Sequence, residues 1–208
     1  MKGRAVFLDR DGVLTAETGA YITRPEALQL LPGAAEAVAR LTAAGWPIFV
    51  VTNQAGVGRG ALTAASLEAI HARLRSAVEA AGGALTAIYA CTHAPEAGCA
   101  CRKPLPGLLL QAAAEHDLDL SACILIGDSP RDIAAGHAAG CHTVLVLTGH
   151  TAAYDPSAFP PPPPDAVFPD LPAAASWLLL QTGTASLFFL IAFLFVFSLW
   201  SLCPLCGL

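Results

Sequence analysis

Val6–Leu14 reads V-F-L-D-R-D-G-V-L, an apolar run that ends abruptly in Asp9, Asp11 and Gly12. A short apolar run of this kind is typical of a buried β-strand. Residues two apart in an extended chain point to the same side, so Asp9 and Asp11 can face one spot beyond the strand. Two carboxylates that close repel each other unless a cation or a shared proton lies between them. The alternative interpretation is a solvated acidic turn, because Asp-Gly is an ordinary turn dipeptide.

Composition excludes some classes of protein. The 208 residues fit one ordinary domain with an appendage, and the net charge of -5 with only 11 basic residues gives no nucleic-acid footprint. Asp9 and Arg10 interrupt any apolar signal-peptide segment, so we expect a cytoplasmic protein. Thiols stay reduced in that compartment, so the 7 cysteines are expected to be metal ligands or buried thiols.

Apolar runs and helical spacings alternate along the chain. Strands are predicted at 5–8, 47–51, 87–90, 123–126, 143–147 and 166–168. Helices are predicted between them at 33–44, 63–82, 107–116, 130–139 and 171–180. This alternation predicts an α/β fold with a doubly wound parallel sheet covered on both faces. We expect the domain to span 1–181, followed by a tail at 182–208.

Polar residues fall where predicted strands end. Asp9, Thr52 and Asp128 each follow or end a different strand, and Lys103 lies in a loop that leaves the third. Because the carboxyl ends of parallel strands share one edge, these four side chains are predicted to meet in one crevice. The set suits phosphoryl transfer, with a carboxylate nucleophile, a second carboxylate (Asp11) for proton transfer, and Mg²⁺ held by Asp9 and Asp128. Thr52 and Lys103 would hold the phosphoryl oxygens.

A second cluster of ligand-type residues lies between the third strand and Lys103. Cys91, His93, Cys99 and Cys101 read C-x-H-x5-C-x-C. Three thiolates and one imidazole make a closed tetrahedral set for zinc, which leaves no position for water and is therefore structural. The alternative is a loop with buried cysteines. We expect the zinc to hold the loop that carries Arg102 and Lys103.

Four motifs resemble those of the haloacid-dehalogenase-like (HAD) phosphatases: D-R-D-G-V-L, V-V-T-N-Q, R-K-P and G-D-S-P-R-D. The resemblance covers about residues 1–180 and implies a Rossmannoid fold. T-N-Q-A-G-V-G-R-G, C-x-H…C-x-C and C-R-K-P resemble the branch that contains heptose-bisphosphate and histidinol-phosphate phosphatases. No large insertion interrupts the motifs, so the enzyme is expected to be capless, with a zinc-binding loop.

The resemblance also implies roles for single residues. Asp9 would be the nucleophile and Asp11 the acid/base, and Mg²⁺ would bind Asp9, the main-chain carbonyl of Asp11 and Asp128. Thr52 and Lys103 would contact the transferring phosphoryl group.

Three further residues are placed by the same resemblance. Asn53 and Arg102 would lie near the substrate, and Asp132 would support the motif around Asp128. An alternative for Asp132 is that it only complements a helix dipole, since it falls in a helix's first turn. For Arg59, a solvated charge is favoured over a substrate contact.

The substrate is expected to be a small phosphorylated sugar. The stretch 126–149 resembles the heptose-bisphosphate enzymes, which favours the 7-phosphate of D-glycero-D-manno-heptose 1,7-bisphosphate. The short zinc loop points weakly to histidinol phosphate, and another small sugar phosphate is a further alternative. A phosphate-binding module without turnover is disfavoured because every residue needed for catalysis is present.

The tail departs from the family. Residues 185–202 are uncharged and rich in Phe and Leu, just long enough for a membrane helix, which needs about 20 apolar residues. Membrane contact is expected only through this tail, either as an anchor or not at all if the segment is an aberrant end. No Lys or Arg follows Arg131 to orient a span, and the roles of Cys203 and Cys206 stay open.

Overall fold

The computed structural model describes residues 3–159 and 161–181. The chain divides after Ala175 into two units, and the sheet and the site belong to the first, Met1–Ala175. The expected domain end after residue 181 stays a prediction, and the tail at 182–208 lies outside the described residues. None of the helices within the described ranges has the length and apolar character needed to cross a membrane.

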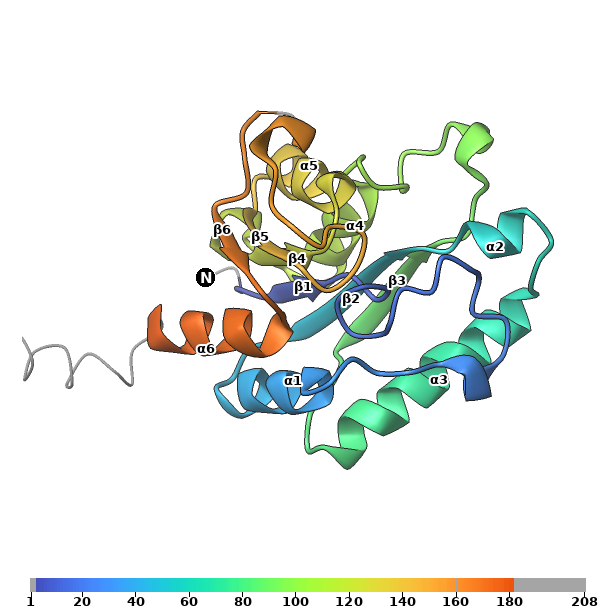
Figure 1. Ribbon diagram of the computed structural model, residues 1–208, viewed down its shortest axis with the longest axis horizontal. Coiled ribbons are helices and arrows are strands. Elements are labelled where there is room, and N and C mark those ends of the chain that lie inside the picture. Colours follow the sequence, from blue (N-terminus) through green and yellow to red (C-terminus); the bar gives the residue numbers. More distant parts are fainter. Residues whose placement is uncertain (1–2, 160, 182–208) are drawn as a thin grey trace, which may run out of the picture. The chain divides into compact units, whose positions relative to one another are not determined.

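Six parallel strands form one sheet in the order β3-β2-β1-β4-β5-β6, which confirms the predicted doubly wound α/β fold (Figure 1). β1 pairs with β2 on one side and with β4 on the other, so the strand order reverses at β1. Ligands of such sheets bind beyond the strand ends at this switch point. The strands are β1 (Val6–Leu8), β2 (Ile48–Asn53), β3 (Ala87–Cys91), β4 (Ile124–Gly127), β5 (His142–Val146) and β6 (Ala166–Phe168).

Helices cover both faces of the sheet. Figure 1 shows α1 (Ala34–Ala43) and α3 (Ala64–Ala80) on one face, and α4 (Gly107–His116) and α5 (Pro130–Ala139) on the other. α6 (Leu171–Gln181) is the last described helix. The remaining short elements are α2 (Ala55–Gly58) and four single 3₁₀ turns, at Pro25–Ala27, Pro95–Ala97, Leu120–Ala122 and Pro156–Ala158.

Two local predictions need correction. Residues 55–60 were expected to form a glycine-rich loop, but Ala55–Gly58 make one helical turn that begins directly after β2. β2 itself runs two residues past its expected end, because Thr52 and Asn53 still pair with β3. Both polar residues are therefore held by the ladder of the sheet rather than by a loop.

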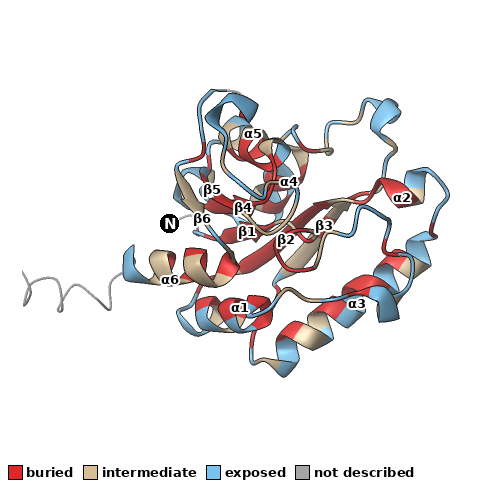
Figure 2. Ribbon diagram, viewed as in Figure 1, coloured by how far each residue is buried: buried red, intermediate tan, exposed pale blue. Residues whose placement is uncertain are grey.

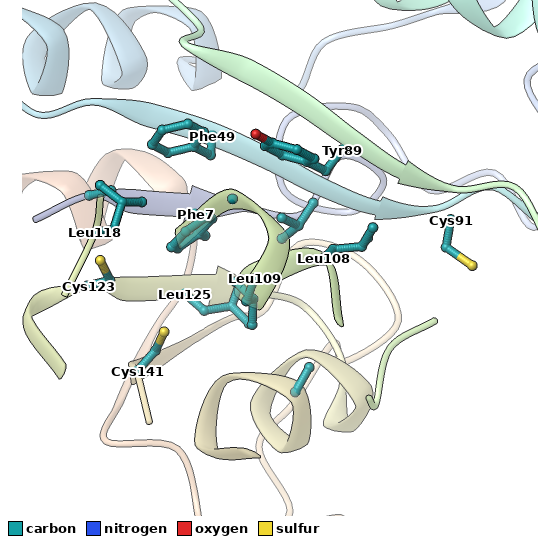
Figure 3. Close-up of a cluster of buried hydrophobic side chains, with 14 residues drawn as sticks. Phe7, Phe49, Tyr89, Cys91, Leu108, Leu109, Leu118, Cys123, Leu125 and Cys141 are labelled. Carbon is teal, nitrogen blue, oxygen red and sulfur yellow. The ribbon is translucent and has the colours of Figure 1, made fainter. Parts of the chain in front are cut away.

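The central strands β1, β2 and β4 form the centre of the core and are drawn mainly in red in Figure 2. All of β1 is buried, and the Phe7 and Phe49 rings pack with centroids 5.3 Å apart beneath α4 (Figure 3). Burying an aromatic or branched side chain of this size contributes about 1.5–3 kcal/mol. Cys123 and Cys141 lie in this cluster, in agreement with their interpretation as core thiols. This core fixes the strand ends that carry the site.

Candidate active site

A cavity of about 410 Å³ opens at the carboxyl ends of the central strands. Residues 16–22 of the loop after β1 form part of its wall, together with Pro95 and His150. All eight predicted catalytic and substrate-contacting residues line it: Asp9, Asp11, Thr52, Asn53, Arg102, Lys103, Asp128 and Asp132. The predicted crevice therefore exists, and segments far apart in the sequence build it.

Asp9 directly follows β1 and lies largely buried at the cavity floor. Its Oδ1 accepts the Arg10 N–H at 2.7 Å and lies 2.9 Å from Lys103 Nζ. Burial raises the pKa of Asp9 to about 8; Lys103 opposes this rise, and the carboxylates of Asp132 and Asp128 add to it. Without an additional cation, the ionised form of this carboxylate is disfavoured.

Lys103 is the buried cation that pairs with Asp9, and its side chain is only 3% exposed. Its Nζ donates to Val51 O at 2.9 Å, and ion-pairs with Asp132 Oδ1 at 2.5 Å and Asp9 Oδ1 at 2.9 Å. Burial alone would lower the pKa of Lys103, but the two carboxylates outweigh it and raise the pKa. The ammonium therefore stays charged at neutral pH and partly balances the carboxylates.

Asn53 holds the main chain of Lys103. Its Nδ2 donates to Lys103 O at 3.0 Å, and its Oδ1 accepts the Lys103 N–H at 3.0 Å. These two bonds fix the loop that carries Lys103 against the end of β2. Asn53 thus lines the cavity while its amide is engaged with the protein.

Asp132 combines both roles that the sequence left open. As the third residue of α5 it forms a reciprocal capping box with Ser129, whose N–H and Oγ both donate to Asp132 Oδ2. Its other oxygen pairs with Lys103, which lowers the pKa of Asp132 against the opposing effect of burial. A side chain at Gly127 would collide with Asp132, since a Cβ there would lie 2.1 Å from Asp132 Cβ.

Asp128 lies beneath two glycines. A Cβ at Gly12 or Gly149 would fall 2.2 or 2.0 Å from Asp128 Oδ2, so neither position accommodates a side chain. Asp128 Oδ2 accepts the N–H of His150 at 2.6 Å and lies 3.2 Å from its ring Nδ1. Burial, and then Asp132, raise the pKa of Asp128, with His150 opposing. Sequence reasoning missed His150 because it treated this residue as an isolated histidine without ligand spacing.

Asp11 is held by a dense set of donors. Arg10, a buried residue that lies between Asp9 and Asp11 in the sequence, donates from Nε to Asp11 Oδ1 at 3.0 Å and from Nη2 to Asp11 Oδ2 at 2.7 Å. Thr15 Oγ1 donates to Oδ1 at 3.0 Å, and Gln54 Nε2 donates to Oδ2 at 2.9 Å. The bidentate Arg fork fixes the plane of the carboxylate. Arg10, Thr15 and Gln54 were not predicted as site residues.

The carboxylates fit a divalent cation. Asp9, Asp128 and Asp132 each offer an oxygen, and these oxygens lie within 4.8 Å of one another. The Asp132 carboxylate already pairs with Lys103 and accepts a hydrogen bond from Ser129. Asp9 Oδ2, by contrast, accepts no hydrogen bond within the described residues. Hard carboxylate oxygens are ligands that Mg²⁺ prefers. The geometry is thus compatible with a cation shared by Asp9 and Asp128.

The Cys/His set forms one compact cluster. Cys91 Sγ lies 3.1 Å from Cys101 Sγ and 3.5 Å from Cys99 Sγ, and His93 Nδ1 lies 3.2 Å from Cys101 Sγ. Sulfurs bound at about 2.3 Å around one tetrahedral zinc would be about 3.8 Å apart, close to this spacing. Burial and the neighbouring thiols raise the pKa of Cys101 to about 12. Among the described residues, all four donors lie within 4.8 Å of one another, as a single metal ion requires.

Arg59 and Arg102 are two further arginines that line the cavity. Arg102 follows the cysteine cluster, and its Nη1 is buried with no hydrogen-bond partner among the described residues. Arg59 donates to Tyr21 Oη at 3.0 Å and to Glu96 at 3.3 Å, and so links three loops. Arg59 is half exposed, so it is both a surface charge and a cross-link.

The chain has known relatives along nearly its whole length. The HAD-hydrolase-like family model matches residues 100–174. The D-glycero-beta-D-manno-heptose-1,7-bisphosphate 7-phosphatase of Pseudomonas aeruginosa is 42% identical over 179 residues, which cover 86% of this chain and 99% of the relative. The enzyme of the same name from Bordetella bronchiseptica is 44% identical over 147 residues, 71% of this chain and 82% of the relative.

A solved structure agrees with these relatives. The D,D-heptose 1,7-bisphosphate phosphatase of B. bronchiseptica, complexed with magnesium and phosphate, has a TM-score of 0.78 and 39% identity and covers 86% of this chain and 99% of its own. Fold, site and relatives together define a phosphatase of the HAD-like hydrolase class. Within this class the chain belongs to the family of the heptose-1,7-bisphosphate 7-phosphatases, as its motifs predicted.

Proposed function

We propose that this phosphatase removes the 7-phosphate of D-glycero-D-manno-heptose 1,7-bisphosphate through a covalent phosphate ester on Asp9. The observation that carries the proposal is the pairing of Asp9 Oδ1 with Lys103 Nζ, 2.9 Å apart at the floor of an open cavity. This pairing supports a mechanism in which the nucleophile and a phosphate-binding cation act on the same phosphoryl group. The family supplies the substrate class, a small phosphorylated sugar.

In the first step, an oxygen of Asp9 forms a bond to phosphorus while the bond from phosphorus to the sugar oxygen breaks. Asp11 donates its proton to that leaving oxygen, which departs as an alcohol. Lys103 and the Thr52 hydroxyl hold the remaining phosphoryl oxygens, whose charge is spread in the transition state.

In the second step, the carboxylate of Asp11 takes a proton from water as the water oxygen attacks phosphorus. The bond between Asp9 and phosphorus breaks, which releases inorganic phosphate and regenerates both starting groups. Arg10 and Thr15 keep Asp11 in place during both steps. Arg102 would contact the substrate beyond the phosphoryl group, and its buried Nη1, which has no hydrogen-bond partner among the described residues, supports this role.

Asp9, Asp128 and the main-chain carbonyl of Asp11 would hold Mg²⁺. When bound there, the ion would neutralise charge as the anionic phosphate approaches the carboxylate nucleophile. The raised pKa values of Asp9 and Asp128 support this assignment, since burial disfavours two negative charges there without a cation.

Cys91, His93, Cys99 and Cys101 would hold a structural Zn²⁺. Lys103 follows Cys101 by two residues, and Asn53 binds its main chain from the opposite side. Zinc and Asn53 together would therefore fix the segment that carries Arg102 and Lys103.

Replacing the nucleophile tests the mechanism. Asp9→Asn is expected to lower kcat/KM by about 10⁴-fold or more with an aryl phosphate and Mg²⁺, because the amide oxygen is a far weaker nucleophile. The matched control is Asp155→Asn, which makes the same change at an exposed turn and should retain wild-type activity. A D9N enzyme within tenfold of wild type (about 1.4 kcal/mol) would refute Asp9 as the nucleophile.

A substrate panel tests the specificity. Heptose 1,7-bisphosphate should give a higher kcat/KM than histidinol phosphate and other sugar phosphates with the wild-type chain. A preference for histidinol phosphate would reassign the enzyme to the other substrate of this branch. No turnover of any phosphate ester would leave a phosphate-binding module instead.

A further inference from the structure

Among the described residues, Gln54 is the one side chain that donates hydrogen bonds both to the phosphate-binding hydroxyl of Thr52 and to the acid/base carboxylate of Asp11. It lies directly after β2 and is 5% exposed. Its Nε2 donates to Thr52 Oγ1 at 2.8 Å and to Asp11 Oδ2 at 2.9 Å. Its main-chain N–H donates to Cys91 O at 2.7 Å, which extends the β2–β3 ladder by one residue. Both side-chain amide protons are therefore directed at groups that the reaction uses.

The bond to Thr52 determines where the hydroxyl proton can go. A threonine hydroxyl has one proton to donate and two lone pairs that accept. Because Thr52 Oγ1 accepts from Gln54, a lone pair is occupied on the protein side. No acceptor in the described part of the chain takes the Thr52 proton, and Thr52 lines the cavity. The hydroxyl is thus oriented to donate to a phosphoryl oxygen.

The bond to Asp11 fixes the second group. Asp11 Oδ2 accepts from Gln54 and from Arg10 Nη2, and Oδ1 accepts from Arg10 Nε and Thr15 Oγ1. Gln54 is the only one of these donors that also contacts a predicted phosphate ligand. Its amide group therefore links the proposed proton donor directly to a proposed phosphate ligand.

We propose that Gln54 is a positioning residue that orients the Thr52 hydroxyl toward the phosphoryl group and holds Asp11 beside the leaving oxygen. The proposal rests on the proposed phosphatase mechanism, in which these two groups act on the same phosphate. Gln54 itself does not touch the reacting atoms. It acts by fixing the geometry before the substrate arrives, when a small misplacement carries a large cost in rate.

Two substrates distinguish the contact of Gln54 with Thr52 from its contact with Asp11. With 2,4-dinitrophenyl phosphate the leaving group needs no proton, so kcat/KM reports phosphoryl binding through Thr52. With an alkyl phosphate the same constant also requires the proton from Asp11. Gln54→Met is expected to lower kcat/KM about 10-fold with the aryl ester and about 100-fold with the alkyl ester. The matched control is Gln111→Met. It removes the hydrogen bond that the Gln111 amide donates to Glu115 on the exposed face of α4, and it should change neither value of kcat/KM.

A double-mutant cycle tests the route through Thr52. In a Thr52→Val background there is no hydroxyl to orient, so adding Q54M should cost less than about 2-fold with the aryl ester. Additive losses, or equal losses for both esters that follow the fall in thermal stability, would overturn the proposal and leave Gln54 a structural residue.

A second variant covers a failure of Q54M to fold. Gln54→Glu keeps the shape of the side chain but its carboxylate does not donate, so the same non-additivity with T52V is expected, together with a larger loss from repulsion of Asp11. Wild-type chain that hydrolyses neither ester would refute the proposed function. Active wild type with an additive cycle would refute only the role of Gln54.

Discussion

The carboxylate cavity and the cysteine cluster both gather potential metal ligands within 4.8 Å of one another, but their surroundings differ in charge. In the cavity the protein supplies its own cation, since Lys103 lies 2.9 Å from Asp9 and closer still to Asp132. In the cysteine cluster the sulfurs contact one another and the His93 ring. There the proposed zinc would be the main positive charge.

This difference separates a catalytic metal from a structural one. A site with a built-in lysine can exist without its ion, so the ion can share its ligands with an entering phosphate. A closed set of three thiols and one imidazole has no vacant position, and metal binding contributes directly to the stability of its loop. Removing the charge of Lys103 should therefore lower the stability of the core, whereas removing the proposed zinc should affect only the loop that carries it.

The largest effect is expected from Lys103→Met. The change leaves Asp9 and Asp132 buried without their partner, which should cost about 3–5 kcal/mol of unfolding free energy. It also removes a contact to the phosphoryl group, so kcat/KM should fall about 10³-fold. Urea unfolding and steady-state kinetics on the full chain measure the two losses.

A second substitution separates the stability loss from the catalytic loss. Adding Asp132→Asn to Lys103→Met removes one of the stranded charges and should recover part of the stability but none of the activity. If Lys103→Met unfolds at the wild-type urea concentration, the cavity does not depend on Lys103 for its charge balance.

A smaller effect is expected from Cys99→Ser in the cysteine cluster. The variant should bind less than one zinc per chain by elemental analysis and lose about 10-fold in kcat/KM, because the segment carrying Arg102 and Lys103 is less well fixed. Its core should keep wild-type far-UV circular dichroism. Cys123→Ala is the matched control. This buried core thiol is not one of the four proposed zinc ligands, so its loss should leave the zinc content intact. Full zinc occupancy in Cys99→Ser would contradict a four-ligand site.

The sequence predicted the sheet well because each strand lies in a short apolar run. The predicted ranges differ from the observed strands by at most two residues at either end. The difference that affects the site is in β2, because the predicted strand ended before Thr52 and Asn53, which the structure includes in it. Their pairing with β3 is a long-range contact, and local polarity carries no information about it. α2 was missed because a single turn is too short to show helical periodicity.

For the site, the sequence located residues but not their partners. Asp9, Thr52 and Asp128 could be grouped because parallel strand ends share one edge. The contacts of Gln54 and His150 could not be predicted, since they depend on how separate loops close over the strand ends. The position of Arg10 could not be predicted either, because alternation along an extended chain points its side chain away from those of Asp9 and Asp11. Its long side chain nevertheless returns to bond both oxygens of Asp11.

The prediction with the smallest effect at neutral pH concerns His71, whose pKa is lowered by burial and by a nearby cation. His71 on α3 is buried, and burial together with Arg10 lowers its pKa to about 4. The unfolded chain takes up this proton near pH 6.5, whereas the folded chain resists it until about pH 4. His71 therefore favours folding at neutral pH, and its contribution is lost as the pH falls from about 6.5 to 4.

His71→Met should remove this sensitivity to acid. Wild type is expected to lose about 3 kcal/mol more unfolding free energy than the variant between pH 7 and pH 4, as measured by urea unfolding at each pH. The comparison between the two proteins cancels the other titrating groups, and both should unfold in one transition at pH 7. Parallel pH profiles would mean that His71 accepts its proton in the folded chain as readily as in the unfolded one.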